Sequence, residues 1–591
     1  GGKPKRYVEV WQGVTLVTNV EVTKTHGDFY TNDTFAQLSW ARGEDQLVYI
    51  AEASTDENDT TKFDYIPDWG ERFTGYTSPT IVVVDLAAKS ARTVPLDPHE
   101  LSPGQVLFGP NATSLVFSGY KRCPQPLGVV YCFNRPISIY QMDLQGHNLE
   151  RLTPTDQSCR SPRLAKDGSR LLYLTNVLGG PHNSCTSLAE YRWADRSVRD
   201  VVPTSMDFAS NPDGFPGLYL NLLLDSPWLS DKSNDDYVVC ASNWGSRSTV
   251  LLIHTFTGVV RNLTPDVSAG SWAVLDTYQN MILAARSTPN QPRTLHLAVP
   301  SPLDFESVMS WDVVRFPERL SCLEALLITP RVDVSSTRTG PLAQCVRTWR
   351  ERTGFTKAPL IVFPHGGPHS VSTTDFTWLV AAYALAGFAT LFTNYRGSLG
   401  FGQTHVESLV GRIGEVEVED VQYMAEAVLR QHADQLDDQR VFYFGGSHGG
   451  FIGAHVSGRY PDFYRAVVLR NPVINVGAMA ATTDIPDWCA VESGFTYSYD
   501  GYNMIHPDRF RAMFEKSPIR AADQVKAATL LLIGEGDRRV PPTDGKAWFA
   551  ALRGRQDPNL VVDMKCYPKV GHALDTVEVE GSNFFHTMRF F

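Results

Sequence analysis

The chain has 591 residues, of which 43% are hydrophobic and 20% are charged, with a formal net charge of −11. Because one domain usually has about 100 to 200 residues, this length predicts at least two domains with separate cores. The charges form no basic cluster and no apolar run reaches the roughly 20 residues of a membrane span, which excludes nucleic acid and membrane from the expected partners.

Residues 1–315 are predicted to be all β. Short alternating or β-branched runs are separated by turn residues, and almost no helical period occurs. Examples are residues 80–84, 171–174 and 250–253.

A weak repeat runs through this half. Trp40 precedes the strand 47–49, and Phe108 precedes the strand 115–117 at the same spacing. Units of a few strands at such intervals favour a β-propeller, whose radial sheets leave few exposed edges. A pair of β-sandwiches is the alternative that the pattern leaves open.

Residues 316–591 show strands that alternate with helices. Val421, Met424, Val428 and Leu429 recur at helical spacing, so we expect an amphipathic helix over residues 420–435. Apolar strands separated by helices predict a doubly wound, mostly parallel sheet covered on both faces. The strands are expected at residues 360–363, 389–392, 441–444, 466–469, 529–533 and 561–567.

Ser447 lies at the centre of the segment 445–450, which reads Gly-Gly-Ser-His-Gly-Gly. The segment follows the strand that ends at Phe444 and precedes a predicted helix from Phe451 to Arg459. A serine on a sharp strand-to-helix turn needs small neighbours, and the turn presents its hydroxyl above the sheet. We therefore expect Ser447 to be a nucleophile.

Asp537 and His572 are the expected acid and base. A serine hydroxyl needs a base to take its proton, and the base needs an acid that orients it. Asp537 follows the strand 529–533, and His572 follows the strand 561–567. Both are thus expected at the carboxyl edge of the sheet, in the chain order serine, acid, histidine. His586 lies in a predicted helix and is the weaker candidate.

Two backbone N–H groups are expected to stabilise the oxyanion. One belongs to His448, directly after the nucleophile, and the other to Gly367, in the loop 364–368 that follows an early strand. An ordinary tight turn is the alternative interpretation of that loop.

The glycine-rich loops resemble those of the prolyl oligopeptidase family. Besides the segments 364–368 and 445–450, the resemblance includes residues 394–402, and it spans the second half of the chain. The stretches 470–475, 483–489, 516–520 and 537–541 resemble the acylaminoacyl-peptidase branch in particular.

This resemblance implies an α/β-hydrolase domain capped by a propeller of seven blades, over residues 316–591 and 1–315. It implies a serine exopeptidase that releases an N-acylated, typically N-acetylated, amino acid from short blocked peptides. It also implies that Arg539 binds a substrate carbonyl through its fixed donors, although a surface ion pair would be the plain alternative.

The residues leave several further activities open. Dipeptidyl peptidases resemble one another in pairing two glutamates for a free ammonium group, whereas the similar segment here has Glu71 beside Arg72. We expect Arg72 to neutralise Glu71, which suits a blocked terminus. A proline-specific peptidase, a carboxylesterase with the same triad and a non-catalytic propeller scaffold are also left open by the sequence.

The nine cysteines are odd in number and form no C-x-x-C pair. Reduced thiols in a cytoplasmic protein are therefore expected. No His, Glu or Cys spacing forms a convincing ligand set, so neither a metal nor another cofactor is predicted. We further expect a homo-oligomer.

Overall fold

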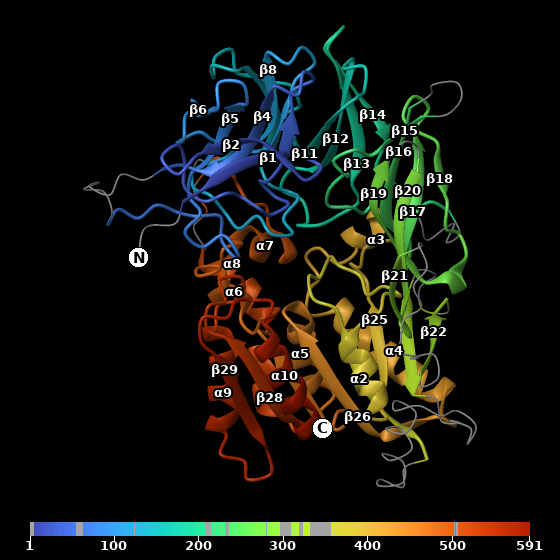
Figure 1. Ribbon diagram of the computed structural model, residues 1–591. Helices are drawn as coiled ribbons and strands as arrows, with labels where there is room; N and C mark the ends of the chain where they lie inside the picture. The colour runs from blue at the N-terminus through green and yellow to red at the C-terminus, as the bar shows by residue number, and fades with distance from the viewer. Residues whose placement is uncertain are drawn as a thin grey trace.

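The structure is a computed structural model. It describes residues 5–54, 63–122, 124–206, 214–230, 236–278, 281–295, 309–317, 319, 323–330, 356–501, 503 and 506–591. Small sheets built from the first half of the chain lie above one large sheet built from the second half (Figure 1). In the described part no helix is long and apolar enough to cross a membrane.

The small sheets are antiparallel and follow one another along the chain. Outside the large sheet the described residues form six of them, and four of these have four strands. Within each of these sheets, strands that are consecutive in the sequence pair with each other, because antiparallel neighbours need no crossover connection. Their strands are β1 (Tyr7–Gln12) and β2 (Thr15–Glu21); β3 (Leu38–Trp40), β4 (Gln46–Glu52), β5 (Pro79–Asp85) and β6 (Ser90–Val94); β7 (Leu101–Phe108), β8 (Ser114–Lys121), β9 (Ile137–Asp143) and β10 (Glu150–Arg151); β11 (Gln157–Leu164), β12 (Arg170–Val177), β13 (Ser187–Arg192) and β14 (Ser197–Val202); β15 (Trp228–Ser230), β16 (Asp236–Asn243), β17 (Ser248–His254) and β18 (Val260–Asn262); and β19 (Ser271–Tyr278), β20 (Met281–Thr288) and β21 (Gln291–Leu295).

Adjacent small sheets share hydrophobic clusters. Leu107 of β7 and Ile139 of β9 pack in one cluster with Leu171 and Tyr173 of β12. Side chains of neighbouring sheets thus cover each other face to face, as expected for radially arranged propeller blades. The short 3-10 helix η1 (Val267–Ala269) precedes β19.

The large sheet has eight strands in the order β22-β23-β25-β24-β26-β27-β28-β29. β22 pairs with β23 and β23 with β25 in antiparallel fashion, and all other pairs are parallel. The strands are β22 (Met309–Arg315), β23 (Glu324–Pro330), β24 (Ala358–Pro364), β25 (Ala389–Asn394), β26 (Leu436–Gly446), β27 (Ala466–Arg470), β28 (Ala528–Gly534) and β29 (Val562–Tyr567). The expected division at residue 315 falls at the end of β22. Because β22 belongs to this sheet, residues 309–315 pack with the second half of the chain and not with the small sheets.

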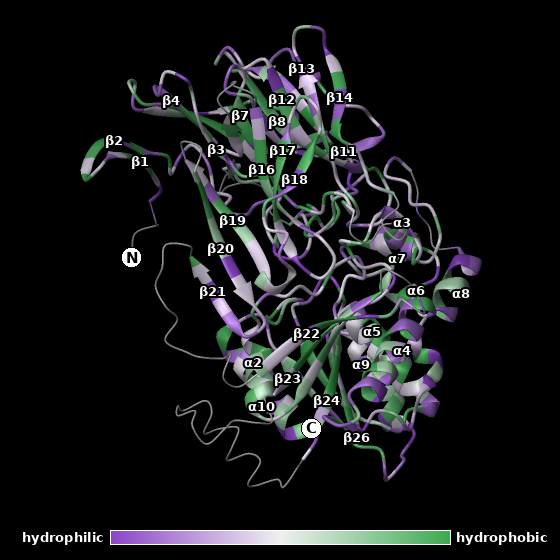
Figure 2. Ribbon diagram, turned by 90° about the vertical axis from the view of Figure 1, so that its right-hand side faces the viewer, coloured by the Kyte–Doolittle hydropathy of each residue, from purple (hydrophilic) through white to green (hydrophobic). Residues whose placement is uncertain are grey.

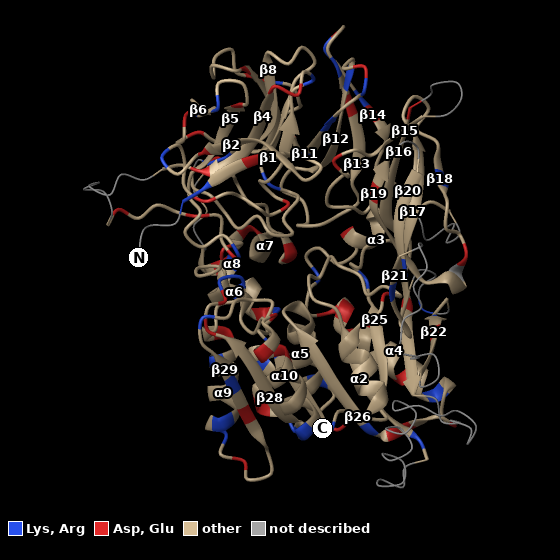
Figure 3. Cartoon of the chain, viewed as in Figure 1, with Lys and Arg blue, Asp and Glu red and all other residues tan. Residues whose placement is uncertain are grey.

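Helices cover both faces of the large sheet. Leu360 and Val362 of β24 pack into one buried cluster, whereas Ile361 between them packs into another. Successive side chains of a strand point to opposite faces of the sheet, and both faces are buried here. The strands are therefore apolar at almost every position. Figure 2 shows β24 and β26 largely in the colour of hydrophobic residues, and Figure 3 shows acidic and basic residues interspersed over both halves of the molecule.

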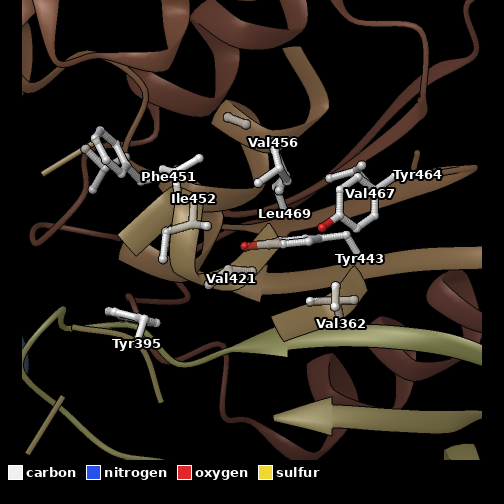
Figure 4. Packing of buried hydrophobic residues seen from close by; sticks show 14 of the residues in the cluster. Val362, Tyr395, Val421, Tyr443, Phe451, Ile452, Val456, Tyr464, Val467 and Leu469 are labelled. Carbon is white, nitrogen blue, oxygen red and sulfur yellow. The ribbon is translucent and has the colours of Figure 1, made fainter. Parts of the chain in front are cut away.

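The larger cluster lies beneath α4 (Val416–Gln431) and α5 (His448–Arg459). In Figure 4, Tyr443 and Val467 of the sheet lie near Ile452 and Val456 of α5. α4 is the helix expected over residues 420–435, and it begins four residues earlier than the apolar period indicated. The remaining helices are α2 (Trp378–Leu385), α3 (Gln403–Glu407), α6 (Val476–Met479), α7 (Pro486–Glu492), α8 (Pro507–Glu515), η3 (Pro518–Gln524), α9 (Thr543–Gly554) and α10 (Val577–Phe590).

Candidate active site

Ser447 lies on the sharp turn between β26 and α5. Its backbone has φ 56° and ψ −122°, and its N–H donates to the carbonyl of Arg470 at 2.9 Å. A Cβ atom on Gly445 would lie 2.5 Å from the carbonyl oxygen of Gly449, and one on Gly449 would lie 2.7 Å from that of Pro364. The flanking glycines are thus required by close backbone contacts, and such strain in a non-glycine residue is typical of functional sites.

Asp537 and His572 form a short hydrogen bond of 2.7 Å between Oδ2 and Nδ1. Asp537 is buried, and its Oδ1 accepts the N–H groups of Arg539 and Val540, each at 2.9 Å. Because both carboxylate oxygens accept hydrogen bonds, Asp537 is held in one orientation and fixes the ring of His572. Among the described residues, no hydrogen-bond partner faces Nε2 of His572.

Ser447 and His572 line one cavity of about 350 Å³, called here the triad cavity. Its other lining residues are Tyr131, His182, Asn183, Gly366, Gly367, His369, Ser370, Val473, Met479, Ile485, Trp488, Arg539 and Val540. Within the described structure, no hydrogen bond joins the Ser447 hydroxyl to His572. In the absence of substrate, hydrogen bonds of this kind are often long and tighten in the complex.

The loop after β24 lies directly against the nucleophile turn. A Cβ atom on Gly366 would lie 3.3 Å from Cβ of Ser447, and Gly367 has φ 122°. Trp488 of α7 donates its indole N–H to the carbonyl of Gly367 at 3.1 Å, which fixes this loop. The structure therefore places Gly367 beside Ser447 in the triad cavity.

His448 reaches the site through its backbone only. Its ring is buried outside the triad cavity, with Nε2 3.2 Å from Oε1 of Glu417. Its N–H belongs to the first turn of α5, where backbone donors lack an acceptor within the helix. This N–H is therefore available at the position expected for an oxyanion donor.

His369, in the loop after β24, lines the triad cavity and contacts a buried carboxylate. Its Nδ1 lies 2.8 Å from the carbonyl of Gly397, and its Nε2 lies 3.1 and 3.2 Å from the carboxylate of Glu492. Burial alone would lower the pKa of His369, but the Glu492 carboxylate outweighs burial and raises it. Both ring nitrogens face acceptors, which agrees with a protonated ring.

Arg539 lines the triad cavity and is not a surface ion pair. It is buried and bonds Asp484 through Nε at 2.9 Å and Nη2 at 3.2 Å, while Nη1 donates to the carbonyl of Val130 at 2.9 Å. Burial disfavours both charges, but their attraction holds the pKa of Arg539 above and that of Asp484 below its ordinary value. The guanidinium is thus fixed at the boundary with the propeller.

Glu71 has a different partner from the one that the sequence suggested. The expected neutralisation by Arg72 is wrong, because Arg72 forms an ion pair with Asp575 at 2.8 Å. The buried Glu71 carboxylate instead accepts the backbone N–H of His572 at 2.8 Å and that of Arg538 at 3.0 Å. A propeller residue therefore connects the loops of the expected acid and base.

A second connection between the domains was not predicted from the sequence. Asp487 of α7 lies 2.8 Å from Nε2 of His182 and also forms a buried ion pair with Arg135. Nδ1 of His182 lies 3.3 Å from the sulfur of Cys132. No local motif marks these residues, since Asp487 lies 305 positions from His182 along the chain.

The triad cavity has a distinctive charge. Among the described residues that line it, none is an aspartate or a glutamate, whereas Arg539 and His369 do line it, paired with Asp484 and Glu492 outside the lining. A free ammonium group would find no carboxylate on this wall. Within the described residues, no cluster of three or more His, Cys, Asp or Glu side chains could hold a metal ion.

Comparison with known proteins agrees with these features. Residues 2–324 match the family model for the N-terminal domain of the acylamino-acid-releasing enzyme, and residues 374–591 match the prolyl oligopeptidase family. The acylamino-acid-releasing enzyme of Rattus norvegicus is 35% identical over 626 residues, which cover 99% of this chain and 83% of the relative.

The chain belongs to the acylamino-acid-releasing enzyme family. The enzyme of Arabidopsis thaliana is 30% identical over 643 residues, covering 98% of this chain and 82% of that protein. The acylaminoacyl peptidase of Pyrococcus horikoshii has the same fold, with a TM-score of 0.71, 18% identity and coverage of 100% of this chain and 84% of that one. The predicted family and the predicted combination of an α/β-hydrolase domain with a β-propeller are confirmed.

Proposed function

We propose that this serine hydrolase releases an N-acylated amino acid from the N-terminus of short blocked peptides. The observation that carries the proposal is the triad cavity, in which Ser447 and His572 lie beside the Arg539 guanidinium and the described lining residues include no carboxylate. Such a wall favours a neutral acylated terminus over a free ammonium group, whose charge would be desolvated without a counter-ion.

In the proposed acylation step, Nε2 of His572 removes the proton of Ser447 while Oγ attacks the carbonyl carbon of the acylated residue. Asp537 stabilises the imidazolium through Nδ1. The backbone N–H groups of His448 and Gly367 hold the oxyanion, and Arg539 binds the carbonyl of the acyl group. His572 then donates its proton to the leaving amine, and the C–N bond breaks.

In deacylation, His572 takes a proton from water, whose oxygen attacks the ester carbon of the acyl-enzyme. The bond between that carbon and Ser447 Oγ breaks, and the proton returns to Oγ. The products are the N-acylated amino acid and the shortened peptide with a free amine. No step needs a cofactor.

A pair of chromogenic substrates tests the proposal. We expect acetyl-alanine p-nitroanilide to be hydrolysed with a kcat/KM at least about tenfold above that of alanine p-nitroanilide, because only the second carries an ammonium group into the cavity. Equal turnover of the two, or a preference for the free amine, would reject the acylated substrate while leaving the serine mechanism intact.

A further inference from the structure

A second cavity, of about 330 Å³, adjoins the triad cavity on the propeller side. Tyr131 lines both cavities, and its neighbours Val130 and Cys132 line the second one. Val130 accepts a hydrogen bond from Arg539. The backbone of Tyr131 has φ 59°, a conformation that non-glycine residues adopt rarely and mostly where surrounding structure or function requires it. A three-residue segment thus separates the two cavities.

Arg160 lines the second cavity and is 2% exposed. It lies on β11 at a bulge, where the pairing with β12 shifts between Arg160 and Arg163. A bulge changes the direction in which a strand residue points, and here a guanidinium is directed away from solvent. Its Cζ atom lies 4.1 Å from the ring centre of Phe133, which also lines the second cavity.

The guanidinium of Arg160 has only uncharged hydrogen-bond partners. Its acceptors are the carbonyl of Asn221 at 2.8 Å, Oδ1 of Asn176 at 2.6 Å, the carbonyl of Leu220 at 3.0 Å and Oγ1 of Thr186 at 3.5 Å. No carboxylate among the described residues forms an ion pair with it. Of its five N–H groups, one on Nη1 has no acceptor in the described part of the chain.

The other charges of the second cavity do not compensate Arg160. Arg72 is paired with Asp575, and Asp33 is exposed and forms no ion pair with Arg160. Burial lowers the pKa of Arg160 to about 9, with Tyr120 and Cys159 acting only weakly against it. A buried charge without a counter-ion destabilises a protein, and an anion that enters the cavity would relieve this penalty.

We propose that the second cavity is an anion subsite in which Arg160 binds a carboxylate of the peptide substrate. The free N–H of Nη1 supplies a charge-assisted hydrogen bond, and Tyr131, which lines both cavities, is the residue past which the substrate would have to extend. The inference rests on the proposed function. Two carboxylates on a short substrate could reach Arg160: the C-terminal group of the peptide, or one at the far end of a dicarboxylic acyl group.

Two substrate pairs distinguish these sources. One pair is acetyl-trialanine and its C-terminal amide; the other is succinyl-alanine and acetyl-alanine p-nitroanilide. We expect one pair to show about a tenfold preference in kcat/KM for the member with the additional carboxylate. The preference should disappear in Arg160→Met and persist in Arg160→Lys, which keeps the charge. The ratio within a pair corrects for any general loss of activity.

The proposal is overturned if neither pair shows a preference in the unmodified enzyme, or if the preference is unchanged in Arg160→Met. The proposed function is judged separately, because acetyl-alanine p-nitroanilide carries no carboxylate. If the enzyme does not cleave that substrate, a binding measurement can still detect the anion subsite.

For binding, the non-hydrolysing Ser447→Ala enzyme is melted with acetyl-trialanine or its amide. A larger rise in Tm with the acid supports a carboxylate subsite, and equal rises overturn the C-terminal source. A parallel comparison of succinyl-alanine amide with acetyl-alanine amide tests the acyl source in the same way. Neither measurement changes Arg160, so both remain decisive even if Arg160→Met fails to fold.

Discussion

The two walls of the triad cavity are constructed differently. On the hydrolase side, each reacting group follows the end of a strand, and neighbouring backbone atoms fix it, as the glycines around Ser447 and the N–H groups around Asp537 show. On the propeller side, long-range side-chain contacts reach across the domain boundary from His182, which lines the cavity, and from Glu71, which is not among its lining residues. We expect the hydrolase side to supply the reacting groups and the propeller side to position their loops.

The largest effect should come from the hydrolase wall. Ser447→Ala removes the nucleophile, so we expect kcat for acetyl-alanine p-nitroanilide to fall by at least about 10³-fold without a change in Tm. Steady-state kinetics and circular dichroism measure the two quantities. Ser457→Ala is the matched control, since that hydroxyl lies in α5, which begins directly after Ser447, and within the described residues it donates to the carbonyl of Ala454. Comparable loss in both variants would contradict the assignment.

Glu71→Gln tests whether the propeller positions the loops of the expected acid and base or merely encloses the site. The amide would present an N–H₂ group to the N–H of either His572 or Arg538, so the loop of the base should shift. We expect kcat to fall about 10- to 100-fold with little change in KM, because a small misplacement of a catalytic group is costly.

Asp575→Asn is the control for Glu71→Gln. This exposed carboxylate lies three residues after His572 and pairs with Arg72 at the surface, where ion pairs contribute little. The kcat of Asp575→Asn should stay within about threefold of that of the unmodified enzyme. If Glu71→Gln behaved in the same way, Glu71 would not position the loop of His572.

A smaller effect concerns pH and the cluster around Asp487. Burial would lower the pKa of His182, but Cys132 and Asp487 outweigh burial and raise it to about 9 from an ordinary 6.5. Because the folded-state pKa is raised, the stabilisation is complete below pH 6.5 and is lost as the pH rises through about 9.

The Tm should therefore decline by a few degrees over this interval, and the decline should be weaker in His182→Gln. The groups that face His182 are Cys132 and Asp487, and Asp487 is itself bonded by Arg135 and Tyr499. Calorimetry at several pH values makes the measurement, with exposed His506→Gln as control. An unchanged pH profile in His182→Gln would show that the cluster does not titrate.

Most of the fold could be predicted from the sequence because its signals are local. The apolar runs at 441–444 and 529–533 lie within β26 and β28, and the glycines around Ser447 mark a turn that few other residues could form. The roles of Glu71 and His182 could not be predicted, since each partner lies hundreds of positions away. The assignment of Ser447, Asp537 and His572 as a triad, the oxyanion donors, the seven blades, the homo-oligomer and the cytoplasmic location stay predictions.

The bridge from Glu71 to the N–H groups of His572 and Arg538 limits how freely the two domains could be recombined. A hydrolase domain produced alone would lose the acceptor for both backbone donors, and a foreign propeller would need a carboxylate at the same point in space. The propeller can therefore be exchanged only for one that supplies this carboxylate. Engineers who exchange propellers to alter selectivity would have to transplant this acid first.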